Sequence, residues 1–285
     1  MTPLIFAWIA SLMYGVEAIA GKLASKHTIQ NPWLFNFFWA LFILLFTIPI
    51  AAWQGISMPA QWVNIALASL FYALTSALYV LALYQIDVSI VGSLYNFRTV
   101  ITVILGALFV GEILTLTQYV LILLIFVGGI FVSVDEKFSV KSFFSKGIGI
   151  GLLGVAASAL MAIFIKKAVA EVDFWSATLW IEILGQVWIL PTILLFKKDL
   201  ISSTLKQYLV TAATAIAGVI GTLAAIKAYA ANVSLSSAII SLPFSLLIAF
   251  LFSRFAPELL EKHTAKVYVV RFVSAAVMIV AALNL

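Results

Sequence analysis

Three ionisable residues stand inside long apolar stretches of the chain: Glu17, Arg98 and Glu182. A charged side chain that faces lipid costs several kcal/mol, so each should face a protein interior, a water-filled cavity or an interface. An arginine in such a place can hold a carboxylate or phosphate through two hydrogen bonds, and a glutamate can face an amine. Glu17 and Glu182 could also take up and release a proton. The alternative is a buried structural ion pair between Arg98 and a glutamate.

Polar and aromatic residues accompany these charges at spacings of three and four, which place them on shared helix faces. Trp39, Tyr79 and Tyr95 could stack on an aromatic or cationic substrate. The same residue types also serve helix packing and the aromatic belts at membrane surfaces, so both roles stay open. The candidate substrate-binding residues are Tyr14, Glu17, Trp39, Tyr79, Tyr95, Asn96, Arg98, Thr99, Glu182, Gln186 and Ser241.

Patterns for bond-making catalysis are missing from the sequence. The chain has no cysteine, which excludes thiolate catalysis and thiolate metal sites. His27 and His263 lie between apolar stretches, with no catalytic spacing to acids. The run Gly149-x-Gly151-x-x-Gly154 fits a dinucleotide fingerprint formally, but it lies in an apolar stretch, where glycines favour close helix packing. We therefore predict no enzyme, no cofactor and no metal site.

Membrane-spanning helices must position these residues. The 285 residues are 65% hydrophobic and 9% charged, whereas a soluble domain carries about 25% charged residues. A helix needs about 20 apolar residues to cross a bilayer. Ten stretches meet this length: 4–23, 33–53, 61–84, 89–110, 116–134, 147–168, 174–196, 207–230, 233–253 and 266–284. We predict an all-α, multi-pass integral protein of the cell (inner/cytoplasmic) membrane, surrounded by lipid and without nucleic acid as a partner.

An internal duplication is visible in the sequence. Tyr84-Gln85-Ile86-Asp87-Val88-Ser89 returns 145 positions later as Tyr229-Ala230-Ala231-Asn232-Val233-Ser234. Each copy opens a long apolar stretch, and the two stretches end alike, at Gly111-Glu112 and Pro257-Glu258. A start and an end in register indicate two related halves.

The halves are predicted as two five-helix repeats, 1–136 and 147–285, joined by the polar linker 137–146. Because five is odd, the second repeat enters the bilayer upside down. Inverted repeats of this kind place a binding site near the bilayer midplane and allow alternating access by rocking. A duplicated structural bundle is the alternative.

The basic residues lie mainly in the loops. Eleven Lys or Arg follow odd-numbered spans, and only Lys166 and Lys167 lie on the other side. The positive-inside rule then puts both termini outside the cell. Within the spans, Lys227 and Arg271 lie near helix ends, where we expect them to reach the membrane surface as anchors.

Residues spread over most of the chain carry a resemblance to a known family: Tyr14-Gly15 with Lys22, the block from Ala82 to Gly111-Glu112, Leu114-Thr115-x-Thr117-Gln118, Pro243, and Pro257-Glu258. In these residues the chain resembles the drug/metabolite transporter superfamily, specifically the EamA-type transporters. The resemblance implies ten helices in two repeats, with spans five and ten at the periphery and both termini in the cytoplasm. Members export amino acids, other metabolites or drugs, and some import metabolites.

Two positions depart from that family's pattern. Arg98-Thr99 stands where members usually have a proline, and Tyr14 stands where the short multidrug relatives have a glutamate. Glu17 therefore does not inherit the role of that glutamate by alignment.

We expect a secondary transporter that acts as a monomer or homodimer. Amino acids or related zwitterions and anions are the favoured substrates, with export as the favoured direction and proton coupling as a separate expectation. Efflux of multiple cationic drugs and uniport of a nucleotide-like metabolite are the alternatives. A membrane scaffold or a channel would be a different class of protein.

Overall fold

The chain is described by a computed structural model over residues 3–98, 100–101, 104, 115–135, 140–231, 239–240, 242–260 and 263–284. All regular structure in these residues is helical, with no strand. The α-helices are α1 (Pro3–His27), α2 (Pro32–Gln54), α3 (Val63–Gln85), α4 (Val88–Leu94), α6 (Leu116–Val132), α7 (Lys146–Glu171), α8 (Phe174–Ile189), α9 (Lys197–Ile201), α10 (Leu205–Ala231), α12 (Phe244–Phe255) and α13 (Ala265–Leu283). Two 3-10 helices are η1 (Val140–Phe144) and η2 (Leu190–Leu195).

Among the described residues, seven helices are long and apolar enough to cross a membrane: α1, α2, α3, α7, α8 with η2, α10 and α13. The helices α6 and α12 are shorter and apolar. The all-α, multi-pass membrane class is confirmed. The count of ten spans stays a prediction, because much of the predicted spans 89–110 and 233–253 lies outside the described residues.

Local sequence explains where several helices begin and end. Asn31 caps α2 by accepting a hydrogen bond from the backbone N–H of Trp33, and Pro32 occupies the first turn. Thr115 and Gln118 form a reciprocal capping box at the start of α6. This box supplies a physical reason for the Thr115-x-Thr117-Gln118 motif.

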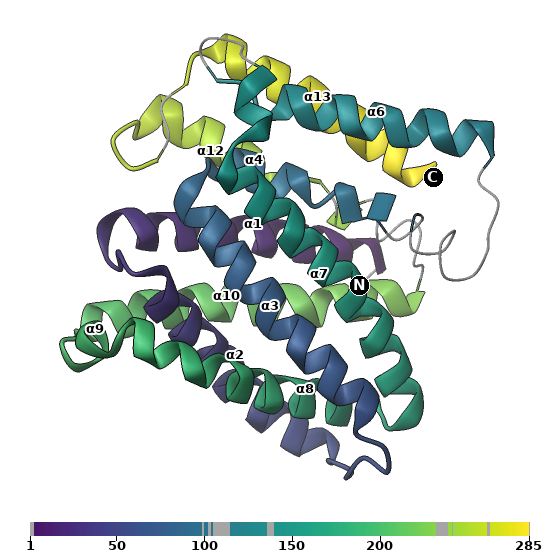
Figure 1. Ribbon diagram of the computed structural model, residues 1–285, viewed down its shortest axis with the longest axis vertical. Coiled ribbons are helices and arrows are strands. Elements are labelled where there is room, and N and C mark those ends of the chain that lie inside the picture. Colours follow the sequence, from purple (N-terminus) through teal and green to yellow (C-terminus); the bar gives the residue numbers. More distant parts are fainter. Residues whose placement is uncertain are drawn as a thin grey trace.

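Long helices of the two halves lie along one another (Figure 1). In that view α6 and α13 run side by side, α3 packs along α7, and α1 packs along α10. When α1, α2 and α3 are compared in chain order with α7, α8 and α10, the contact of α3 with α8 matches that of α10 with α2. The helix α2 contacts α8, and α4 contacts α12.

Glycines permit the close approach of α7 to α3 and α4. A Cβ at Gly151 would lie 3.0 Å from the Leu94 side chain, and one at Gly154 would lie 3.2 Å from Leu78. Gly149, in contrast, faces open space. The glycine run therefore lies inside a helix and serves packing at two of its three positions, as predicted, rather than nucleotide binding.

The predicted polar linker contributes to the core. Its 3-10 helix η1 carries Phe143, which is 5% exposed. The Phe143 ring packs against the rings of Phe97 and Phe126. This aromatic cluster ties the segment between the predicted repeats to α6.

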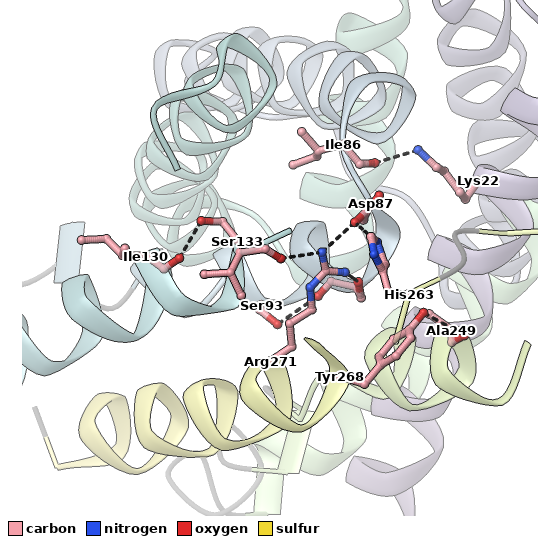
Figure 2. A network of polar contacts seen from close by, with 12 residues as sticks. Lys22, Ile86, Asp87, Ser93, Ile130, Ser133, Ala249, His263, Tyr268 and Arg271 are labelled. Atoms are coloured by element: carbon pink, nitrogen blue, oxygen red, sulfur yellow. Dashed lines mark hydrogen bonds and ion pairs between the residues drawn. The ribbon is translucent and has the colours of Figure 1, made fainter. Parts of the chain in front are cut away.

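A buried ion pair joins the start of α4 to α13 (Figure 2). Arg271 donates from Nη2 to Asp87 Oδ2 at 2.8 Å and to the Val134 carbonyl at 3.0 Å, and from Nη1 to Ser89 Oγ at 2.6 Å. His263 Nε2 lies 2.7 Å from the same Asp87 oxygen. Arg271 is only 1% exposed. The expectation that it reaches the membrane surface is therefore wrong, because a partner carboxylate from a distant segment compensates its burial.

The electrostatics of Asp87 follow from these contacts. Burial alone would raise the pKa of Asp87, but the hydrogen bond with His263 and the charge of Arg271 bring that pKa well below its usual range. Asp87 precedes α4 in the N-cap position, yet its side chain caps no backbone N–H there. The carboxylate thus serves the tertiary contact instead of the helix start.

Replacing Asp87 by Asn should lower the thermal unfolding midpoint of the protein in detergent. The change leaves a buried guanidinium without its carboxylate, and removing one partner of a buried ion pair costs about 3 kcal/mol or more. Arg254→Gln, at an exposed arginine in the last turn of α12, is the matched control and should leave the midpoint unchanged. Equal midpoints for Asp87→Asn and the unsubstituted protein would contradict a stabilising role for this pair.

The same comparison has a defined pH dependence. Because the folded protein lowers the pKa of Asp87, the stabilisation is fully present above the unfolded pKa of an aspartate, about 4. It is lost as the pH falls through the lower, folded pKa. The difference in midpoint between Asp87→Asn and the unsubstituted protein should therefore persist at pH 5 and narrow only in stronger acid.

Candidate functional site

A cavity of about 640 Å³ lies between helices of both halves of the chain. This volume falls in the range of small-molecule sites, about 300–1,000 Å³. Residues from α1, α2, α3, α4, α7, α8, α10, α12 and α13 line it. Eight of the eleven candidate residues are among them: Tyr14, Glu17, Trp39, Tyr79, Tyr95, Asn96, Arg98 and Glu182.

Both carboxylates in the cavity accept hydrogen bonds from α2. Trp39 Nε1 donates to Glu17 Oε1 at 3.1 Å, and Thr47 Oγ1 donates to Glu182 Oε1 at 3.3 Å. The two donors are eight residues apart, which is about 12 Å along a helix axis. The two carboxylates therefore sit at different depths of the cavity.

The donors to both carboxylates are neutral. Among the described residues, neither Glu17 nor Glu182 forms an ion pair with Arg98. For these described residues, the alternative of a structural pair is therefore excluded, both for Arg98 with Glu17 and for Arg98 with Glu182. Both signs of charge face the same cavity without neutralising each other in direct contact.

Glycines on facing helices make room for cavity side chains. A Cβ at Gly218 of α10 would collide with the Glu17 carboxylate, whose Cδ would lie 2.8 Å away. A Cβ at Gly185 of α8 would collide with the ring of Tyr72. The helices α10 and α8 thus approach the cavity closely at these two positions.

Aromatic rings form one wall of the cavity. The ring centroids of Trp39 and Tyr79 lie 5.8 Å apart, and those of Tyr79 and Tyr95 lie 6.1 Å apart. The Tyr95 hydroxyl is within electrostatic reach of both Glu17 and Arg98. Tyr95 thus lies near both charges, on the turn that follows α4.

Several buried polar atoms of the lining have no hydrogen-bond partner among the described residues: Tyr72 Oη, Thr75 Oγ1 and Glu182 Oε2. Buried polar atoms are nearly always hydrogen-bonded in proteins. Glu182 is 9% exposed, so a free lone pair of a buried carboxylate faces the cavity. Such atoms are suited to the polar groups of a bound solute.

The remaining candidates divide into two groups. Gln186 is buried one turn beyond Glu182 and does not line the cavity. Thr99 and Ser241 lie outside the described residues.

Sequence reasoning missed Thr47, Tyr72 and Thr75. Tyr72, Thr75 and Tyr79 follow the spacing of three and four on α3 that marked the polar face of α1. The same test applied to α3 would have found them. Thr47 stands alone in the apolar α2, and no local pattern singles it out.

The lining of the cavity extends toward the end of the bundle that holds both chain termini, and we infer that the cavity opens there. Its lining includes Ser11 near the start of α1 and Leu283 at the end of α13. On α7 and α10 it uses Met161, Ile165 and Val219, in the C-terminal halves of those helices. Figure 1 shows the N- and C-termini on the same side of the bundle, opposite α9.

Residues 1–134 match the EamA-like transporter family. The first half of the chain is similar to this family. The resemblance seen in the sequence is confirmed for that half, and the family identifies a multi-pass membrane transporter with a small-molecule substrate and lipid as its surroundings. No curated protein matches the chain.

The direction of the opening can be measured with single cysteines, because the chain has none of its own. Val219 lines the cavity. Val80 of α3, in contrast, is fully buried in a cluster with residues of α1, α2 and the segment that joins them. A cysteine at Val219 should react with a maleimide in detergent, and a cysteine at Val80 should stay unreactive until the protein is denatured. Equal reaction rates at the two sites would contradict a cavity open at one end.

Proposed function

We propose that the protein is a secondary transporter that exports amino acids or related zwitterions across the cell membrane by alternating access. The observation that carries the proposal is that Glu17 and Arg98, of opposite charge, line one cavity together with Tyr95. A zwitterion presents the complementary pair of charges.

The substrate carboxylate pairs with Arg98, whose planar guanidinium can offer two parallel hydrogen bonds. The substrate amine pairs with Glu17, which Trp39 already holds in place from α2. The rings of Tyr79 and Tyr95 cover the apolar part of the substrate. A simple anion would satisfy only Arg98.

We also propose that the chain consists of two inverted five-helix repeats, and the pairing of helices supports this. Exchanging the halves converts the pair α1 and α10 into α7 and α3, and the pair α2 and α10 into α8 and α3. We group α1, α2 and α10 as one bundle and α3, α7 and α8 as the other. Rocking these bundles about the contact of α2 with α8 would close one end of the cavity and open the other.

A second candidate function is efflux of cationic compounds. Two carboxylates, Glu17 and Glu182, line the cavity together with the aromatic rings of Trp39 and Tyr79. Carboxylates and aromatic faces both attract organic cations. Uniport of a nucleotide-like anion would depend on Arg98 alone.

Counterflow in liposomes distinguishes these functions. Liposomes that contain the purified protein and are loaded with mixed amino acids should accumulate labelled amino acid. Arg98→Gln or Glu17→Gln should reduce the rate of accumulation about 100-fold or more, as expected for loss of a buried charge-assisted contact. Arg254→Gln, at an exposed arginine, is the matched control and should transport normally.

The outcomes separate cleanly. Normal counterflow by Arg98→Gln would refute the zwitterion mode. Transport of cationic drugs that requires both Glu17 and Glu182 but not Arg98 would favour the second candidate. Passive conductance without saturation would place the protein among channels.

Proton coupling is tested by a pH gradient across the same liposomes. If Glu17 or Glu182 exchanges a proton for substrate, a gradient should drive substrate accumulation above its equilibrium level. Glu182→Gln should then retain counterflow and lose the response to the gradient, whereas Glu17→Gln also removes the partner of the substrate amine and should lose both. A steady-state distribution that ignores the gradient would make the protein a uniporter.

A further inference from the structure

The closed end of the cavity is held by Lys22. Its ammonium donates to the carbonyls of Leu83 and Ile86 at 2.7 Å each, and the side chain is 6% exposed (Figure 2). Leu83 lies in the last turn of α3 and Ile86 directly follows the helix, where carbonyls lack intrahelical partners and carry partial negative charge. A lysine of α1 thus caps the C-terminal end of α3, from the opposite bundle.

Neighbouring contacts close the same end. Tyr84 Oη donates to the Ile29 carbonyl at 2.6 Å. A Cβ at Gly21, next to Lys22, would lie 2.9 Å from the Leu83 side chain. The end of α3 is therefore pressed against α1 and the segment before α2.

The segment that receives these contacts is the repeated one. Tyr84 corresponds to Tyr229, 145 positions later, and the same interval takes Lys22 to Lys167 on α7. It also takes the carbonyl acceptors Leu83 and Ile86 to Ala228 and Ala231, at the end of α10. The second half thus holds a lysine and a helix end at the equivalent positions.

The second lysine is not engaged in the same way. Lys167 is exposed, and its ammonium lies 5.7 Å from the ring centroid of Phe164 on its own helix. In the part of the chain that the structure describes, α1 contacts α3, but α7 and α10 do not pack together. Ile165 of α7 and Val219 of α10 both line the cavity.

We propose that Lys22 and Lys167 are paired latches that determine which end of the cavity is closed. Lys22 caps α3 in the conformation described here, and Lys167 caps α10 at the Ala228 and Ala231 carbonyls when the opposite end closes. This inference rests on the proposed alternating access between inverted repeats. It adds that a lysine cap at one end is exchanged for a lysine cap at the other.

Because one lysine cap forms when the other is released, the two conformations stay close in free energy. A transporter needs both states to be populated, which requires a difference of only a few kcal/mol between them. A single latch would trap one state, because a buried ammonium that loses its acceptors is costly until water reaches it. Opening an end admits that water, so the released lysine becomes hydrated as Lys167 is here.

The experiment uses the two cysteine reporters in detergent, without substrate. Lys22→Met should increase the maleimide reaction rate at Val80→Cys at least about tenfold and slow the reaction at Val219→Cys, because two charge-assisted hydrogen bonds at the closed end are lost. Lys26→Met removes an exposed lysine one turn further along α1 and should change neither rate. Unchanged labelling at Val80→Cys in monodisperse Lys22→Met protein would overturn the proposal.

The double variant Lys22→Met/Lys167→Met distinguishes a latch from local unfolding. Removing the second latch destabilises the alternative state too, so reaction at Val80→Cys should fall back toward the rate of the unsubstituted chain. A double variant that reacts as fast as Lys22→Met would exclude Lys167. If Lys22→Met does not fold, Lys167→Met alone should slow the residual reaction at Val80→Cys several-fold, and an unchanged rate would overturn the proposal.

The latch and the proposed transport fail in different ways. Labelling reports the conformation and needs no substrate, whereas counterflow reports transport. Reporters that switch as expected in a protein without counterflow would leave the latch standing and remove the transport proposal. Counterflow with reporters that do not switch would do the reverse.

Discussion

A charge buried in a membrane protein must find its partner within the protein, and this constraint governs how the helices are placed. The chain meets it in three ways. Arg271 takes a carboxylate from the segment between α3 and α4. Lys22 takes two backbone carbonyls at a helix end. Glu17 takes an indole N–H from the adjacent α2, which satisfies only one of its oxygens.

These three solutions differ in how easily they can be undone. The guanidinium of Arg271 makes contacts with Asp87, Ser89 and Val134, so it is bound on several sides and holds its neighbours rigidly. The Lys22 contacts depend on the position of a single helix end. The Glu17 carboxylate borders the cavity and keeps capacity for another donor. Rigid anchoring, reversible capping and binding thus follow from the same constraint.

The sequence predicted what depends on local composition and periodicity. Apolar length identified the spanning helices, and central charges identified Glu17, Arg98 and Glu182 as lining one site. It could not predict contacts between distant segments. Arg271 lies near a helix end and its partner Asp87 is 184 residues away, so nothing local distinguishes it from a surface anchor. Thr47 could be identified as a site residue only from the structure, in which it donates a hydrogen bond to Glu182 of α8.

The two ends of the bundle are chemically unequal, and this bears on which conformation the chain prefers. At the closed end Asp87 binds Arg271 and His263. Under the predicted duplication, Asn232 stands in the place of Asp87 and α6 in the place of α13, and α6 contains no basic residue. No equivalent ion pair can therefore form at the other end. Each half has a lysine that can cap a helix end, but only the first half has the ion pair. Closure of the end beside Asp87 is therefore stabilised more strongly than closure of the other end. This agrees with the conformation described here, in which that end is closed.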